Sequence, residues 1–176
     1  LGRAAGDLSH EVRGSFDQGI ALLKNPAGGL IVQNVTEYAK SLDIDVTEVM
    51  GYLALQELAH ARLFASVPWL MPRFEALLGK YARGITIDMD AMEEQIREAE
   101  SIDPDSMASA VNITKVAFPD TPEQKQAMKA LENLLALVEG WVDAVVWRAG
   151  MAHIPHIEQL REMLRRERAI GGPAER

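Results

Sequence analysis

Apolar side chains recur every three or four positions along most of the chain, the spacing that places them on one face of a helix. This spacing predicts helices over residues 1–23, 35–42, 46–65, 69–81, 88–100, 106–111, 122–150 and 156–169. Two short runs rich in β-branched residues, 30–32 and 85–87, predict brief strands at most. We therefore expect a mainly α fold.

Capping residues place some of the helix ends. Asp45, with Glu48 three residues later, is typical of a capping box, and Thr121 with Gln124 repeats the pattern around Pro122. Arg83-Gly84 predicts a break between two helices, and Gly171-Gly172-Pro173 predicts the end of the last one. No internal repeat divides the chain. We expect one domain over residues 1–176, itself part of a longer protein.

The composition disfavours several classes of function. The net charge of −8 disfavours nucleic acid, which requires clustered positive charge. The basic run from Arg161 to Arg168 is better interpreted as a solvated helix face. No long apolar run predicts a membrane span, and no cysteine is present, which is in keeping with a reducing, cytoplasmic location. Any metal site must therefore use histidine and carboxylate ligands.

The helix predicted over residues 46–65 contains Gln56-Glu57-Leu58-Ala59-His60, one residue away from His-Glu-x-x-His. In that motif two histidines one helical turn apart hold zinc, and the glutamate activates water. At about 100° per residue, Gln56, Glu57 and His60 share an arc with apolar neighbours and should point inward. A buried hydrogen-bond network of the three side chains explains the pattern equally well.

A second polar pair lies in the helix predicted over residues 122–150. Glu139 and Asp143 are four residues apart and share an otherwise apolar face. Such a pair can contribute to a metal site. It can also hold helices together by bonding to His60, Arg62 or Arg148.

Five segments together resemble a family of bacterial zincin-like proteins described as hydrolases or zinc-dependent metallopeptidases. The resemblance rests on Ala54–Leu70, Tyr81–Asp88, Thr121–Lys125, Leu134–Asp143 and Leu160–Glu175, and it spans the chain from about Leu30 to its end. It implies a multi-helix zincin-like fold and a zinc cofactor.

The resemblance also implies roles for single residues. By position, Glu57 matches the general base, His60 the second histidine ligand and Glu139 the glutamate ligand. Asp143 matches the carboxylate that orients a histidine ligand. Gln56 stands where the first histidine ligand belongs, so the chain departs from the family pattern at that position.

Three functions are compatible with these residues, and we favour the first. It is a zincin-like protein with a degenerate metal site, catalytically inactive or impaired, that serves as a binding or structural domain. The second is an active zinc-dependent peptidase with a replacement ligand, for which His153 and His156 are the nearest source. The third is a helical interaction module that needs no metal. A hydrogen bond from Gln56 to His60 or Glu139 would favour the first.

We expect neither a nucleic acid nor a membrane partner. A peptide or protein partner and a homo-oligomer stay open.

Overall fold

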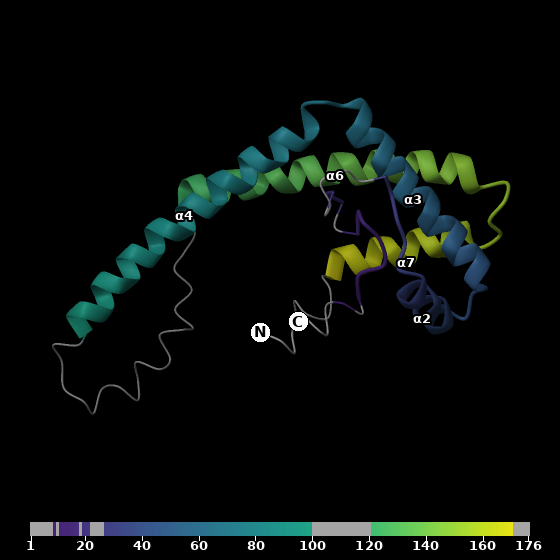
Figure 1. Ribbon diagram of the computed structural model, residues 1–176, viewed down its shortest axis with the longest axis horizontal. Coiled ribbons are helices and arrows are strands. Elements are labelled where there is room, and N and C mark those ends of the chain that lie inside the picture. Colours follow the sequence, from purple (N-terminus) through teal and green to yellow (C-terminus); the bar gives the residue numbers. More distant parts are fainter. Residues whose placement is uncertain (1–8, 10, 18, 22–26, 100–120, 171–176) are drawn as a thin grey trace. The chain divides into compact units, whose positions relative to one another are not determined.

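Five helices make up most of what the computed structural model describes, namely residues 9, 11–17, 19–21, 27–99 and 121–170 (Figure 1). They are α2 (Val32–Leu42), α3 (Val46–Ser66), α4 (Leu70–Ala99), α6 (Pro122–Gly150) and α7 (Ile157–Ile170). In these parts of the chain, extended pairing is limited to one antiparallel bridge, Gly14 with Leu30. The prediction of a mainly α fold is confirmed.

The chain divides into two compact units, Leu1–Pro68 with Leu135–Arg176, and Trp69–Leu134. Helix α6 contributes its first half to the second unit and its second half to the first. The candidate site lies wholly in the first unit. The expectation of one domain over residues 1–176 stays a prediction.

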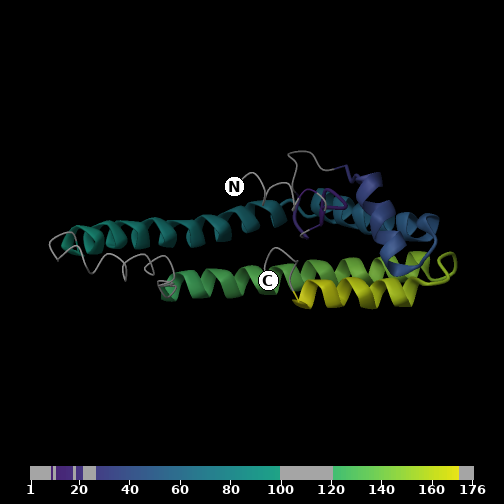
Figure 2. The same ribbon diagram turned by 90° about the horizontal axis from the view of Figure 1, so that it is seen from below.

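The first unit is built around α3. Helix α2 packs against α3, α7 also contacts α3, and the second half of α6 runs beside α7 in both views (Figures 1 and 2). The buried side chains include Val49, Tyr52, Val142, Val146 and Leu160. Burying an aliphatic side chain of this size stabilises a fold by about 1.5–3 kcal/mol, so this apolar layer fixes the inward face of α3.

The start of α3 matches the predicted capping box only in part. Asp45 is the N-cap, and its Oδ1 accepts a hydrogen bond from the Thr47 amide at 2.8 Å. Glu48 does not complete a capping box. Its carboxylate instead accepts a hydrogen bond from the His156 amide at 3.1 Å, at the start of α7, where a helix favours negative charge.

In the second unit, the predicted break at Arg83-Gly84 is wrong, because α4 continues through it to Ala99. The predicted strand over residues 85–87 is wrong for the same reason. Gly84 is buried, and a Cβ there would overlap the side chain of Gln124. The glycine therefore permits close packing of α4 on α6 and does not interrupt the helix.

The capping box at the start of α6 is confirmed. Thr121 Oγ1 accepts a hydrogen bond from the Gln124 amide at 3.2 Å, and Gln124 Oε1 accepts one from the Thr121 amide at 2.8 Å. The predicted extents of α2, α3, α6 and α7 agree with the structure to within three residues at each end. The helix predicted over 106–111 and the end predicted at 171–173 lie outside the described residues.

The helix predicted over residues 1–23 is wrong for residues 12–17 and 19–21, which are not helical. Residues 13–15 instead pair antiparallel with residues 29–31, and we call the stretches 11–17 and 27–31 around this pairing the paired segments. The Ser15 amide donates to the Gly29 carbonyl at 3.1 Å, and the Ile31 amide donates to the Arg13 carbonyl at 2.8 Å. The strand predicted over residues 30–32 is reduced to the bridge at Leu30, because α2 begins at Val32.

Candidate functional site

The face of α3 that the helical period predicts to be buried is buried. Gln56, Glu57 and His60 are all inside, and His60 is only 2% exposed. Leu58, on another face of the same turn, is exposed. Three neighbouring polar side chains in a core need hydrogen-bond partners, and their partners define what this site can do.

His60 links α3 directly to α6. Its Nε2 lies 2.8 Å from Glu139 Oε1, and its Nδ1 lies 2.9 Å from the backbone carbonyl oxygen of Gln56. The ring also stacks on Phe16, with the centroids 5.3 Å apart and the planes 12° from parallel. Each ring nitrogen thus faces an oxygen atom, one from the backbone of α3 and one from the side chain of Glu139 on α6.

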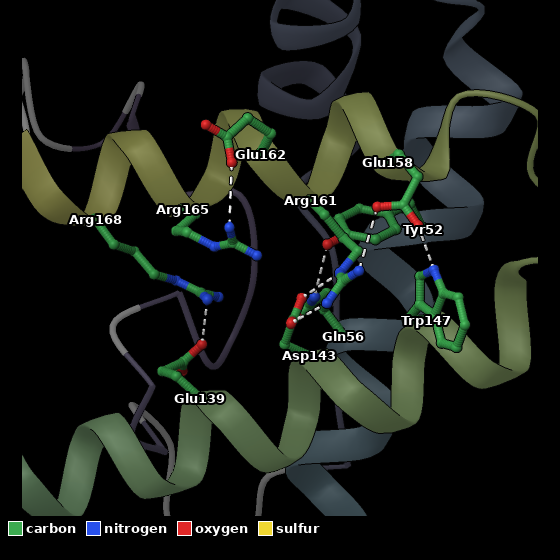
Figure 3. A network of polar contacts seen from close by, with 10 residues as sticks. All are labelled: Tyr52, Gln56, Glu139, Asp143, Trp147, Glu158, Arg161, Glu162, Arg165 and Arg168. Carbon is green, nitrogen blue, oxygen red and sulfur yellow. Dashed lines mark hydrogen bonds and ion pairs between the residues drawn. The ribbon is translucent and has the colours of Figure 1, made fainter.

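Arg168 of α7 reaches the other carboxylate oxygen of Glu139. Its Nη1 lies 2.5 Å from Oε2, and Figure 3 shows the two side chains meeting between α7 and α6. Both oxygens of Glu139 therefore face a donor from the chain itself. The sequence analysis did not assign Arg168 to the site, although a carboxylate on an apolar stripe requires a cation or a donor.

Asp143 is held by a second arginine of α7. Arg161 donates from Nε to Oδ1 at 2.8 Å and from Nη2 to Oδ2 at 2.6 Å, a two-point contact (Figure 3). The hydrogen bonds from Arg161 lower the pKa of the Asp143 carboxyl below its ordinary value, and the same bonds raise the pKa of Arg161. Asp143 thus binds an arginine where the resemblance implied a histidine.

These contacts correct the interpretation of the basic run from Arg161 to Arg168 as a solvated face. Two of its arginines bind the acidic pair on α6, and only the two between them, Arg165 and Arg166, pair with Glu162 on the same helix. In the alternative interpretation, the acidic pair on α6 holds helices together, and the residues that bind the pair here are His60, Arg161 and Arg168. Neither Arg62 nor Arg148 is among the ion pairs of the described residues.

Glu57 is turned toward the paired segments. Its Oε2 accepts hydrogen bonds from the Ser15 amide at 3.0 Å, the Ser15 hydroxyl at 2.5 Å and the Gly29 amide at 2.9 Å. Its Oε1 accepts one from the Phe16 amide at 3.1 Å. A carboxylate has about four acceptor positions, so these donors fill its capacity.

The side chain of Gln56 does not bond to His60 or Glu139. Its Nε2 donates to the Tyr52 hydroxyl at 3.0 Å, one turn back on α3 (Figure 3). Its Oε1 is buried and has no hydrogen-bond partner among the described residues. The link between Gln56 and His60 is made by the Gln56 backbone alone.

These residues, as the structure places them, do not fit zinc. Ligands about 2.0–2.1 Å from a tetrahedral zinc lie roughly 3.3 Å apart, so His60 Nε2 and Glu139 Oε1 are closer than a shared ion allows by about half an ångström. Arg168 also brings positive charge to the same carboxylate. Within the described ranges, no group of three or more histidine, aspartate or glutamate side chains could hold a metal ion.

The histidines considered as replacement ligands are engaged or exposed elsewhere. His156 Nδ1 lies 3.0 Å from a Glu48 oxygen, and His153 is exposed in the turn between α6 and α7.

The whole chain, residues 1–176, matches the family described as zincin-like metallopeptidase. The chain belongs to this family. Comparison with curated proteins gives no match, and comparison with solved structures gives none either. In the part of the chain that the structure describes, none of the helices combines the length and the apolar character that crossing a bilayer requires.

Proposed function

We propose that this chain is a zincin-like protein whose metal site is degenerate, and that hydrolysis is absent or impaired. In this proposal the domain serves a binding or structural purpose without zinc. In its binding purpose the domain takes a peptide or protein partner in the cytoplasm, and the inward polar face of α3 holds the fold together.

One observation carries the proposal: one oxygen of Glu139 lies within hydrogen-bond distance of His60, and the other is in an ion pair with Arg168. A guanidinium is permanently charged and cannot leave by losing a proton, so it competes with a metal ion at any ordinary pH. The family's glutamate ligand would have to release Arg168 before it could bind zinc.

Two further contacts support the same conclusion. Gln56, at the position of the first histidine ligand, offers a carboxamide oxygen, and zinc binds imidazole, thiolate or carboxylate in preference to it. Glu57 would have to give up four hydrogen bonds before it could take a proton from water. The three residues of the pattern that remain, Glu57, His60 and Glu139, are thus engaged in contacts within the chain.

The experiment is elemental analysis of zinc in the purified chain and in Gln56→His, prepared side by side. We expect little zinc in the native chain and more in the variant, because the variant regains a second imidazole one turn from His60. Near-stoichiometric zinc in the native chain would contradict the proposal. So would peptide hydrolysis by the native chain that is abolished by a chelator and restored by zinc.

A further inference from the structure

Glu57 joins the two paired segments to α3. Three of its four hydrogen bonds come from Ser15 and Phe16 in the first segment, and the fourth comes from Gly29 in the second. The segments also bond to one another across the Gly14–Leu30 bridge. One carboxylate therefore fastens two stretches of chain that are not adjacent in sequence.

The first segment lies against Glu57 too closely for any side chain at Gly14. A Cβ on Gly14 would overlap the Glu57 carboxylate, at a distance that real contacts do not reach. Gly19, which follows the first segment, has a φ of +74°, and a Cβ there would lie 2.6 Å from Glu139 Oε1. Glycine thus allows the backbone to cover both carboxylates of the site.

Phe16 places an aromatic ring on the remaining polar side chain. It is 2% exposed and stacks on His60, and its centroid is 5.6 Å from that of Phe64 on the next turn of α3. The first segment therefore contacts Glu57 through its backbone and His60 through Phe16. The first segment thus covers Glu57 and His60, and Gly19, which follows it, lies against Glu139.

We infer that the paired segments are a closed lid over the surviving site, and that Glu57 is its fastener. The carboxylate that the family pattern assigns to water activation is used here to hold the chain's own backbone against α3, with Phe16 over His60. This inference does not require zinc and goes beyond the loss of the metal site, because it gives Glu57 a present function. A lid fastened in this way excludes ligands from the site until these hydrogen bonds open.

The lid is tested by hydrogen–deuterium exchange of the whole chain, followed in peptides covering residues 11–17 and 27–31. Glu57→Gln keeps the shape of the side chain but turns an NH₂ group toward the amide donors. We expect exchange in both peptides to become faster by at least about tenfold, the factor expected when a charge-assisted hydrogen bond to a locally opening segment is lost. A peptide within residues 134–150 serves as the internal reference and should not change.

Two glycine variants give a matched pair. Gly14→Ala pushes a methyl group into Glu57, whereas Gly29→Ala, in the second segment, meets nothing within 4 Å and keeps its amide donor. We expect Gly14→Ala to exchange faster in both peptides and Gly29→Ala to match the native chain. Equal effects of the two variants would mean that chain stiffness, and not the carboxylate contact, controls the segments.

Native exchange rates in Glu57→Gln would overturn the inference, since the segments would then be held by packing alone. If Glu57→Gln also speeds exchange in the reference peptide, the variant has disturbed the whole fold, and Ser15→Ala becomes the test of the lid. That variant removes only the hydroxyl donor to Glu57 and should speed exchange in the two peptides alone; no change would overturn the inference. None of these outcomes depends on zinc content, so the proposal of a lid and the proposal of a degenerate metal site can be rejected independently of each other.

Discussion

Arg168 lies 2.5 Å from the carboxylate oxygen of Glu139 that His60 does not bind, so one glutamate joins α6 to both α7 and α3. We expect Arg168→Ala to lower the free energy of unfolding by about 1–2 kcal/mol, because it leaves a mostly buried carboxylate oxygen without a partner. The value is at the low end for a charged contact because the arginine side chain is 38% exposed.

Urea denaturation at neutral pH measures this change. Arg166→Ala is the matched control, since Arg166 is more exposed and, among the described residues, its ion pair is with Glu162 on its own helix. The control should change stability by less than about 0.5 kcal/mol. Equal losses in the two variants would show that Glu139 does not depend on Arg168.

The same arginine should limit the recovery of zinc binding. If Arg168 competes for Glu139, the double variant Gln56→His/Arg168→Ala should bind zinc more tightly than Gln56→His alone, by about tenfold or more. Competition with a chromophoric chelator measures both affinities. Equal affinities would mean that Arg168 moves aside at no cost, which would remove the observation on which the proposed function rests.

The contact between Asp143 and Arg161 should appear in the pH dependence of stability. The folded state holds the pKa of Asp143 below its ordinary value, so the contact stabilises the fold above about pH 4, the ordinary aspartate pKa. That contribution is lost as the pH falls below about 4 and through the lowered pKa. Asp143→Asn should therefore be less stable than the native chain at neutral pH and approach it at about pH 3.

Urea denaturation at several pH values between neutral and about pH 3 follows the difference between the two proteins. A difference that stays constant over this range would show that the carboxylate charge contributes nothing and that the substitution acts through packing.

Two glycines of α4 should respond to alanine in opposite directions. Gly84→Ala drives a methyl group into the buried side chain of Gln124 and should cost about 1–3 kcal/mol. At Gly79 the nearest atom is 3.6 Å away, at the end of Arg83, so Gly79→Ala should stabilise the helix by about 0.5–1 kcal/mol. Thermal unfolding followed by circular dichroism distinguishes them. A stabilising Gly84→Ala would show that α4 and α6 do not pack there.

The sequence predicted the parts of the site that lie within one helix. The helical period of about 100° per residue is a local property, so it placed Gln56, Glu57 and His60 on one buried face and paired Glu139 with Asp143. It did not identify the groups that bind them. Arg168 comes from a different helix, α7, and only tertiary packing brings it to Glu139.

The N-terminal prediction failed for a related reason. Leu8, Val12, Phe16 and Ile20 have helical spacing, but backbone amides of this stretch satisfy Glu57 instead of a helical ladder. The Glu57 carboxylate, a strong acceptor on α3, thus took the amide donors that a helix over these residues would have used. At Gly84 the reverse occurred, because a residue that disfavours helices is kept inside α4 by its contact with α6.

The four donors on Glu57 change what a retained motif means. Glu57 and Glu139 hold parts of this domain together through these contacts, and this structural use does not require hydrolysis. Gln56 makes one side-chain hydrogen bond, from Nε2 to the Tyr52 hydroxyl on its own helix, and its side-chain oxygen binds nothing among the described residues, so it joins no two elements of the fold. Drift could therefore alter the first ligand position while leaving the glutamates intact, and the presence of those glutamates in a sequence is no measure of whether its owner is an enzyme.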